Sequence, residues 1–119
     1  MLLPIVALLL GFAIGQFTKI SIPAALAPYM SVSLLAALDS VLGGVRATLE
    51  DTFDDLIFVT GFFSNALLAG ALAFLGDKLG VNLYMAAIFA FGVRLFENLA
   101  LIRRIIIAKA SNRAKQKKS

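Results

Sequence analysis

The chain has no cysteine, no histidine and no tryptophan, and only 15% of its 119 residues are charged. Without cysteine there is no disulfide, thiolate metal site or cysteine nucleophile, and without histidine there is no imidazole ligand or histidine-based triad. A soluble domain carries about 25% charged residues, so a soluble enzyme and a disordered protein are both poor fits. We expect no enzymatic activity, no metal and no cofactor.

Apolar residues are abundant instead. They make up 61% of the chain, and the mean hydropathy is +0.94. These values are typical of a multi-pass protein of the cell membrane. A membrane span needs about 20 residues, so three or four spans use nearly the whole chain and leave no room for a soluble catalytic domain.

Four helices are expected, over residues 2–17, 28–42, 56–76 and 81–107. We interpret the first as a retained helix rather than a secretory signal, because no basic residue precedes it. Residues 45–56 are the most polar internal stretch and predict a loop or a short surface helix. Residues 76–80 predict a tight turn, because Gly76 and Gly80 can both adopt positive φ.

The fold predicted is an all-α integral membrane protein, a small bundle of four transmembrane helices. The alternative is three spans plus one interfacial helix, with the second apolar segment on the inner surface. Residues 1–107 form the transmembrane domain and residues 108–119 a basic cytoplasmic tail, expected to be frayed or disordered. Excess Lys and Arg mark cytoplasmic segments, which places the C-terminus in the cytoplasm. The residues assigned to topology and lipid contact are Arg103, Arg104, Lys109, Arg113, Lys115, Lys117 and Lys118.

Small residues predict helix packing faces. Gly11 and Gly15 have the G-x-x-x-G spacing that lets two membrane helices approach closely. Gly43 and Gly44 predict a bend or a close helix contact. In the third apolar segment, small residues that recur every three or four positions predict a face packed on another helix; among them are Ala66 and Gly70.

Ionisable residues inside the apolar segments are the candidate functional residues, because a charge in the bilayer is costly unless it is paired or solvated. We predict a buried polar cluster of Asp39, Arg46, Arg94, Glu97 and Asn98. Its role is left open between structural glue that fixes helix register, docking of a partner, and an ion or proton relay.

The charges outside the apolar segments favour plain surface roles. Glu50, Asp51, Asp54 and Asp55 carry the oxygens that divalent cations prefer, but a solvated loop is the simpler interpretation. The basic tail has no interleaved aromatic residues on which bases could stack, so we expect no nucleic-acid partner. Contact with anionic lipid explains the tail better.

Several segments resemble the small basic protein family of Gram-positive and related bacteria, and the resemblance covers about residues 2 to 105. It is carried by residues 35–47 (LAALDSVLGGVRA), 53–55 (FDD), 61–63 (GFF) with Asn65, 75–81 (LGDKLGV), 83–84 (LY) and 91–96 (FGVRLF) with Asn98. The resemblance implies a membrane protein of uncharacterised function, encoded near cell-division and cell-wall genes. It implies no catalytic residues. Because Glu97 lies outside these motifs, we favour pairing of Arg94 with Asp39.

The function expected is therefore that of a non-enzymatic interaction or scaffold component in cell division or envelope assembly. Its partners would be membrane lipid and other membrane proteins of these processes, with a homo-oligomer as a further option. The alternative is a small oligomeric transporter or ion channel.

Overall fold

The structure is a computed structural model that describes residues 2–118. It contains four α-helices and, within these residues, no strand: α1 (Leu2–Phe17), α2 (Ala27–Leu49), α3 (Asp55–Leu79) and α4 (Leu83–Lys118). Helices α2, α3 and α4 are each long and apolar enough to cross a membrane, whereas α1 is an apolar helix of 16 residues. The predicted all-helical bundle is confirmed, and the shortest helix is the first one rather than the second.

Local sequence explains where the helices begin and end. Pro28 lies in the first turn of α2, where a backbone N–H has no partner within the helix, so the lack of an N–H in proline costs no hydrogen bond. Asp54 caps α3, because its carboxylate accepts a hydrogen bond from the N–H of Ile57 at 3.0 Å. Helix α3 ends at Leu79 and is capped by Gly80, whose φ of 73° is readily adopted only by glycine. The expected turn at 76–80 therefore lies later, and Gly76 itself is helical.

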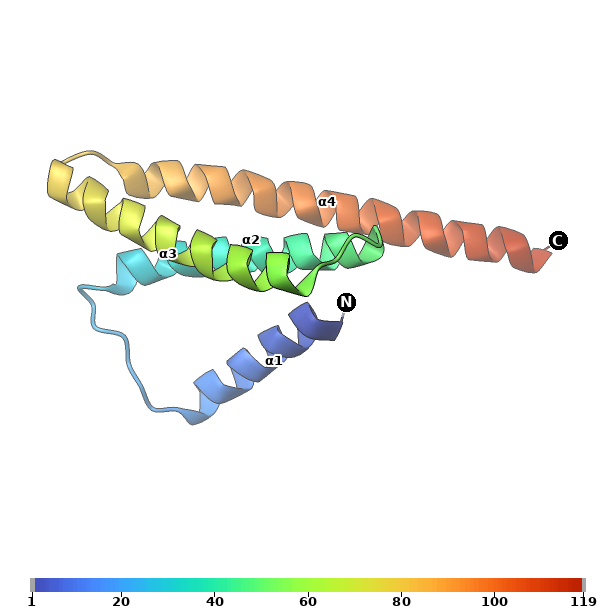
Figure 1. The fold of residues 1–119 in the computed structure, drawn as a ribbon, viewed down its shortest axis with the longest axis horizontal. Helices are drawn as coiled ribbons and strands as arrows, with labels where there is room; N and C mark the ends of the chain where they lie inside the picture. The colour runs from blue at the N-terminus through green and yellow to red at the C-terminus, as the bar shows by residue number, and fades with distance from the viewer. Residues whose placement is uncertain (1, 119) are drawn as a thin grey trace.

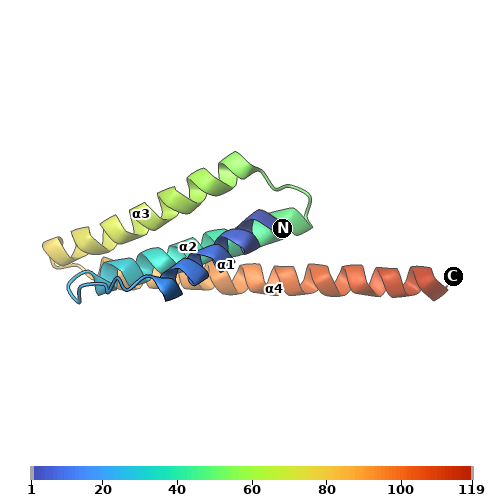
Figure 2. The same cartoon turned by 90° about the horizontal axis from the view of Figure 1, so that it is seen from below.

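The three long helices run alternately up and down, so that α2 and α4 point the same way and α3 points the opposite way (Figure 1). Helix α3 leans away from the other two toward its Asp55 end (Figure 2). Helix α1 lies apart from the bundle along most of its length and approaches it near its beginning, where Pro4 is close to Gly44. The bundle thus consists of α2, α3 and α4, with α1 loosely attached.

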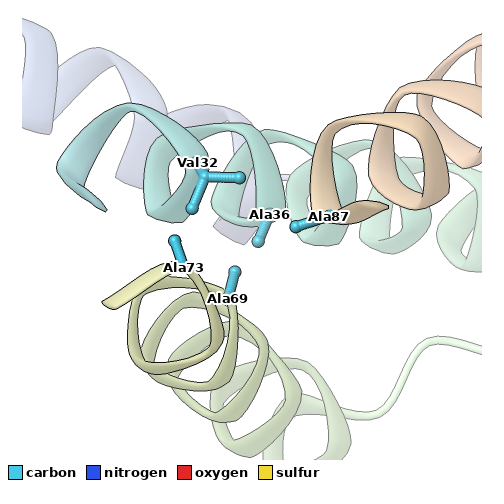
Figure 3. Close-up of a cluster of buried hydrophobic side chains, with 5 residues drawn as sticks. All are labelled: Val32, Ala36, Ala69, Ala73 and Ala87. Atoms are coloured by element: carbon cyan, nitrogen blue, oxygen red, sulfur yellow. The ribbon is translucent and has the colours of Figure 1, made fainter. Parts of the chain in front are cut away.

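The hydrophobic core is built from small residues. Figure 3 shows Val32 and Ala36 of α2 between Ala69 and Ala73 of α3 and Ala87 of α4. Alanine lets helix backbones approach closely, which is how helices associate in lipid, where burial of apolar surface supplies no driving force. This core confirms the small-residue face predicted in the third apolar segment.

Two sequence-based expectations about the polar segments are corrected. Residues 45–49 belong to α2, so the loop before α3 is only residues 50–54. The tail from residue 108 onward is not frayed, because α4 continues to Lys118. Its Ala, Lys, Arg and Gln residues are strong helix formers, and neither Gly nor Pro interrupts them. The domain boundary at residue 107 stays a prediction.

Candidate functional site

Four of the five residues of the predicted polar cluster lie together between α2 and α4. The carboxylate of Asp39 accepts a hydrogen bond from the Asn98 side-chain amide at 3.2 Å and forms an ion pair with Arg94, 3.3 Å between Oδ2 and Nη2. The Asn98 oxygen accepts a hydrogen bond from Arg46 at 3.4 Å. Arg46 also pairs with Glu50 on the next turn, at 3.1 Å. A continuous polar network therefore joins the two helices.

The two ends of the central ion pair differ in their surroundings. The Asp39 side chain has no exposed surface, whereas 57% of the Arg94 side chain is exposed. The guanidinium of Arg94 also lies 6.0 Å from the centre of the Phe91 ring, one turn earlier on α4. The carboxylate is thus enclosed by the bundle, and its cation reaches the outer surface of α4.

Glu97 lies outside this network. It is exposed on α4 and makes no hydrogen bond or ion pair with any residue in 2–118. The position three residues after Arg94 places both side chains on one side of the helix, but their contacts differ. The preference for Arg94 pairing with Asp39 is confirmed. Glu97 is exposed on the outer surface of the bundle.

Some of the glycines and alanines predicted to pack helices make close contacts with another helix, and others make none. A Cβ atom added to Gly44 would lie 2.8 Å from the Phe58 ring, and one added to Gly70 would lie 2.5 Å from Ser33 Oγ. The Ala66 carbonyl accepts a hydrogen bond from that same Ser33 hydroxyl, at 2.8 Å. Gly44 and Gly70 therefore allow close contacts, and α2 passes Gly44 as continuous helix. Gly43 is less crowded, with Asn98 Nδ2 at 3.9 Å.

Gly11 and Gly15 are the predicted packing residues that make no close contact with another helix. An added Cβ at either position meets no atom within 4 Å in the described chain, so this face makes no close contact inside the molecule. Gly11 lines an apolar cavity of about 500 Å³ between α1 and the bundle. Other side chains that line the cavity include Ala7, Phe12, Leu34, Leu38, Phe58 and Phe62. Of the two roles open to a packing face, the bundle or a homo-oligomer, the described residues show no close contact within the bundle at Gly11 and Gly15, and a homo-oligomer contact stays a prediction.

Several polar contacts were not anticipated from the sequence. Glu50 was interpreted as a loop residue, although its spacing of four from Arg46 is the signal for a helical ion pair. Tyr29 donates a hydrogen bond to Asp77, which joins the beginning of α2 to the end of α3. Asn65 donates to Ser40 at 3.2 Å. The last two are interhelical, and no spacing within the sequence indicates such pairs.

The charged residues beyond the apolar segments lie mainly at one end of the bundle. The 50–54 loop is at this end, where the Lys109 ammonium donates to the Leu49 carbonyl at 2.9 Å. Within residues 2–118, no three acidic side chains converge in a group that could hold a metal ion. The six other basic residues assigned to topology and lipid, which are Arg103, Arg104, Arg113, Lys115, Lys117 and Lys118, are exposed on α4. Their contact with lipid stays a prediction.

Comparison with known proteins places the chain among relatives whose function is unknown. It is 53% identical to the "Small basic protein" of Bacillus subtilis over 119 residues, covering 100% of this chain and 98% of that protein. It is 41% identical over 102 residues to uncharacterized proteins of Mycobacterium bovis and Mycobacterium tuberculosis, covering 84% of each chain. No solved structure matches. The profile of the family described as "Protein of unknown function (DUF1290)" matches residues 22–107, and the chain belongs to this family.

Proposed function

We propose that this chain is a non-enzymatic, multi-pass protein of the bacterial cell membrane that binds another membrane protein through α4. In this proposal its C-terminus is cytoplasmic, because basic residues are enriched on that side of the membrane. The process it serves is cell division or envelope assembly, which is what the sequence resemblance to the small basic protein family implies.

The observation that carries this proposal is the exposure of Arg94 and Glu97 on α4. Arg94 lies 11 residues after Leu83, or about 16 Å along the helix. That is near the middle of a hydrocarbon core about 30 Å thick. A charged side chain at this depth costs about 3 kcal/mol when it faces lipid. Contact with polar groups of another transmembrane helix removes that cost.

The surface beside Glu97 suits a close helix contact. Ala86, Ala90 and Val93 precede it at helical spacing, and all three are exposed. Small residues let a partner helix approach the α4 backbone, which shortens the distance from its polar side chains to Glu97 and Arg94. The partner expected is a transmembrane helix with a basic or amide side chain at mid-depth.

Site-directed crosslinking tests this interface. A photoreactive residue at Val93 or Phe96, which are 55% and 71% exposed, should capture a partner in intact membranes. Leu67 on α3 is 72% exposed and provides a matched control on a different helix. Glu97→Gln should reduce capture from Val93, since it removes a charge that has no role in the internal network. Equal capture from α3 and α4 would argue against a defined interface.

A second candidate function, a small oligomeric transporter or ion channel, is favoured by the buried carboxylate of Asp39 in a helix long enough to span the membrane. Its test is ion flux in liposomes that contain the purified protein. Flux that is lost in Asp39→Asn but retained in Glu97→Gln would support transport. If crosslinking from α4 yields only copies of this chain and flux is present, transport replaces the scaffold proposal.

A further inference from the structure

Helix α4 extends well beyond the helices it packs against. The contact between Lys109 Nζ and the Leu49 carbonyl, 2.9 Å, marks the level at which α2 ends. From Lys109 to Lys118 there are nine more residues of continuous helix, or about 13 Å. In Figure 1 this end of α4 projects alone past the rest of the molecule. All of its residues from 110 to 118 are exposed.

The charges on this extension are ordered. Lys109, Arg113 and Lys117 are spaced by four residues and form one stripe along the helix. Lys115 and Lys118 lie on a different side of it. The short side chains of Ala110 and Ala114 lie beside the stripe and leave a shallow, open depression next to Arg113 and Lys117. No acidic residue occurs after Glu97, so nothing on this part of α4 neutralises the stripe.

The outer part of the stripe lies too far out to be held by the membrane surface. A hydrocarbon core of about 30 Å that begins at Leu83 ends near Arg103, and the headgroup layer adds about 5–7 Å. Arg113 lies about 15 Å beyond Arg103, and charges separated by more than about 8 Å are largely screened at physiological salt. No Gly or Pro follows Gly92 to let the helix bend onto the surface.

We propose that the stripe of Lys109, Arg113 and Lys117 binds an acidic protein segment in the aqueous phase where α4 emerges. Carboxylates spaced along such a segment match the cations, and the short side chains of Ala110 and Ala114 let the segment approach the helix beside Arg113 and Lys117. Nucleic acid fits less well, because no aromatic residue after Phe96 is available to stack on bases. This surface is separate from the Arg94 and Glu97 face, so it does not depend on partner binding there, and it rests only on the part of the proposed function in which α4 spans the membrane.

The test uses the full-length protein in zwitterionic nanodiscs at physiological salt. The probe is a fluorescent helical peptide that carries glutamates four residues apart, and its binding is measured by anisotropy. Arg113→Gln with Lys117→Gln should weaken binding about tenfold, since two exposed ion pairs are lost. The matched control is Lys115→Gln with Lys118→Gln, which has the same net charge and should retain most of the affinity. Equal losses in the two double variants would overturn the proposal.

Two further measurements separate the competing ligands. Because the chain has no cysteine, Ala114→Cys provides a single site for a spin label. The label should stay accessible to a water-soluble relaxation agent in nanodiscs that contain anionic lipid, as it is in zwitterionic ones. Protection by anionic lipid, or tighter binding of a DNA duplex than of the acidic peptide, would overturn the proposal. Unchanged helicity by circular dichroism shows that the variants are folded.

Discussion

Asp39 on α2 and Arg94 on α4 form an ion pair in which only one partner is enclosed. Their atoms Oδ2 and Nη2 are 3.3 Å apart, the aspartate side chain is fully buried, and the arginine side chain is 57% exposed. The aspartate therefore depends on the arginine and on Asn98 for its charge compensation. Arg94 in turn links the interior of the bundle to the outer surface of α4, where Glu97 is also exposed.

Removal of Arg94 should destabilise the bundle more than removal of both charges. In Arg94→Leu the buried carboxylate loses its cation, and the loss of stability should be about 3 kcal/mol. Asp39→Asn in the same chain should restore most of it, because the amide needs no cation and can still hydrogen-bond to Asn98. Unfolding of the purified protein in mixed detergent, followed by circular dichroism, measures both. Additive effects of the two substitutions would contradict this coupling.

Gly70→Ala should loosen the contact between α2 and α3. The new Cβ would lie 2.5 Å from Ser33 Oγ, and rotation of that hydroxyl would break its hydrogen bond to Ala66. We expect a net loss of about 1–2 kcal/mol after the gain in helix propensity. Gly61→Ala on the same helix is the control, since its Cβ meets no described atom within 4 Å.

A second substitution, Ser33→Ala, should restore part of the stability lost in Gly70→Ala, and unfolding in mixed detergent measures both effects. Ser33→Ala removes the obstructing oxygen, and the nearest remaining side-chain atom of that residue, Cβ, is 3.9 Å from the added atom. The double variant Ser33→Ala with Gly70→Ala should therefore be more stable than Gly70→Ala alone. If the rescue fails, the crowding at Gly70 lies elsewhere.

The turn between α3 and α4 should depend on two glycines for different reasons. Gly80 has a φ of 73°, so Gly80→Ala should cost about 1 kcal/mol and Gly80→Asn less. Gly76 is helical, but an added Cβ would lie 2.6 Å from the Val81 carbonyl oxygen. Moving a backbone atom costs more free energy than rotating a side chain, so Gly76→Ala should lower the stability more than Gly80→Ala. Thermal unfolding in detergent compares the three variants, and equal effects at Gly76 and Gly80 would count against this explanation.

Single cysteines in this cysteine-free chain should report its path through the membrane. The loop after α1 and the turn before α4 lie at the opposite end of the molecule from the 50–54 loop (Figure 1). With four spans, Ser21→Cys and Asn82→Cys should react with an impermeant maleimide added to intact cells, whereas Thr52→Cys should react only after permeabilisation. If Asn82→Cys reacts and Ser21→Cys does not, α2 fails to cross and the protein has three spans, with the second apolar segment on the inner surface.

Much of the architecture could be predicted from local patterns. The apolar segments could be predicted as helices because a segment in lipid must satisfy its own backbone hydrogen bonds. The small-residue face of α3 could be predicted from residues that recur every three or four positions. The pairing of Arg94 with Asp39 was favoured because both residues belong to motifs of the family. Glu97 was grouped with them because residues three apart share one side of a helix, yet a shared side does not decide which side chain reaches the carboxylate of Asp39.

Other features depend on how the helices are packed together. The burial of Asp39, the hydrogen bond from Asn65 to Ser40 and the crowding at Gly70 all arise between helices that are distant in sequence. The length of α4 was also underestimated, because a run of basic residues was interpreted as a tail although its helix propensity is high.

Composition and the local spacing of apolar residues were enough to predict the class of protein and the number of helices, and the residue inventory alone excludes cysteine and histidine chemistry. The packing of the helices is what encloses Asp39, turns Arg94 and Glu97 outward and leaves α1 with few contacts to the bundle. Those properties depend on the rotation and approach of each helix relative to its neighbours. Contacts between side chains far apart in the chain set that rotation, and no local pattern records it.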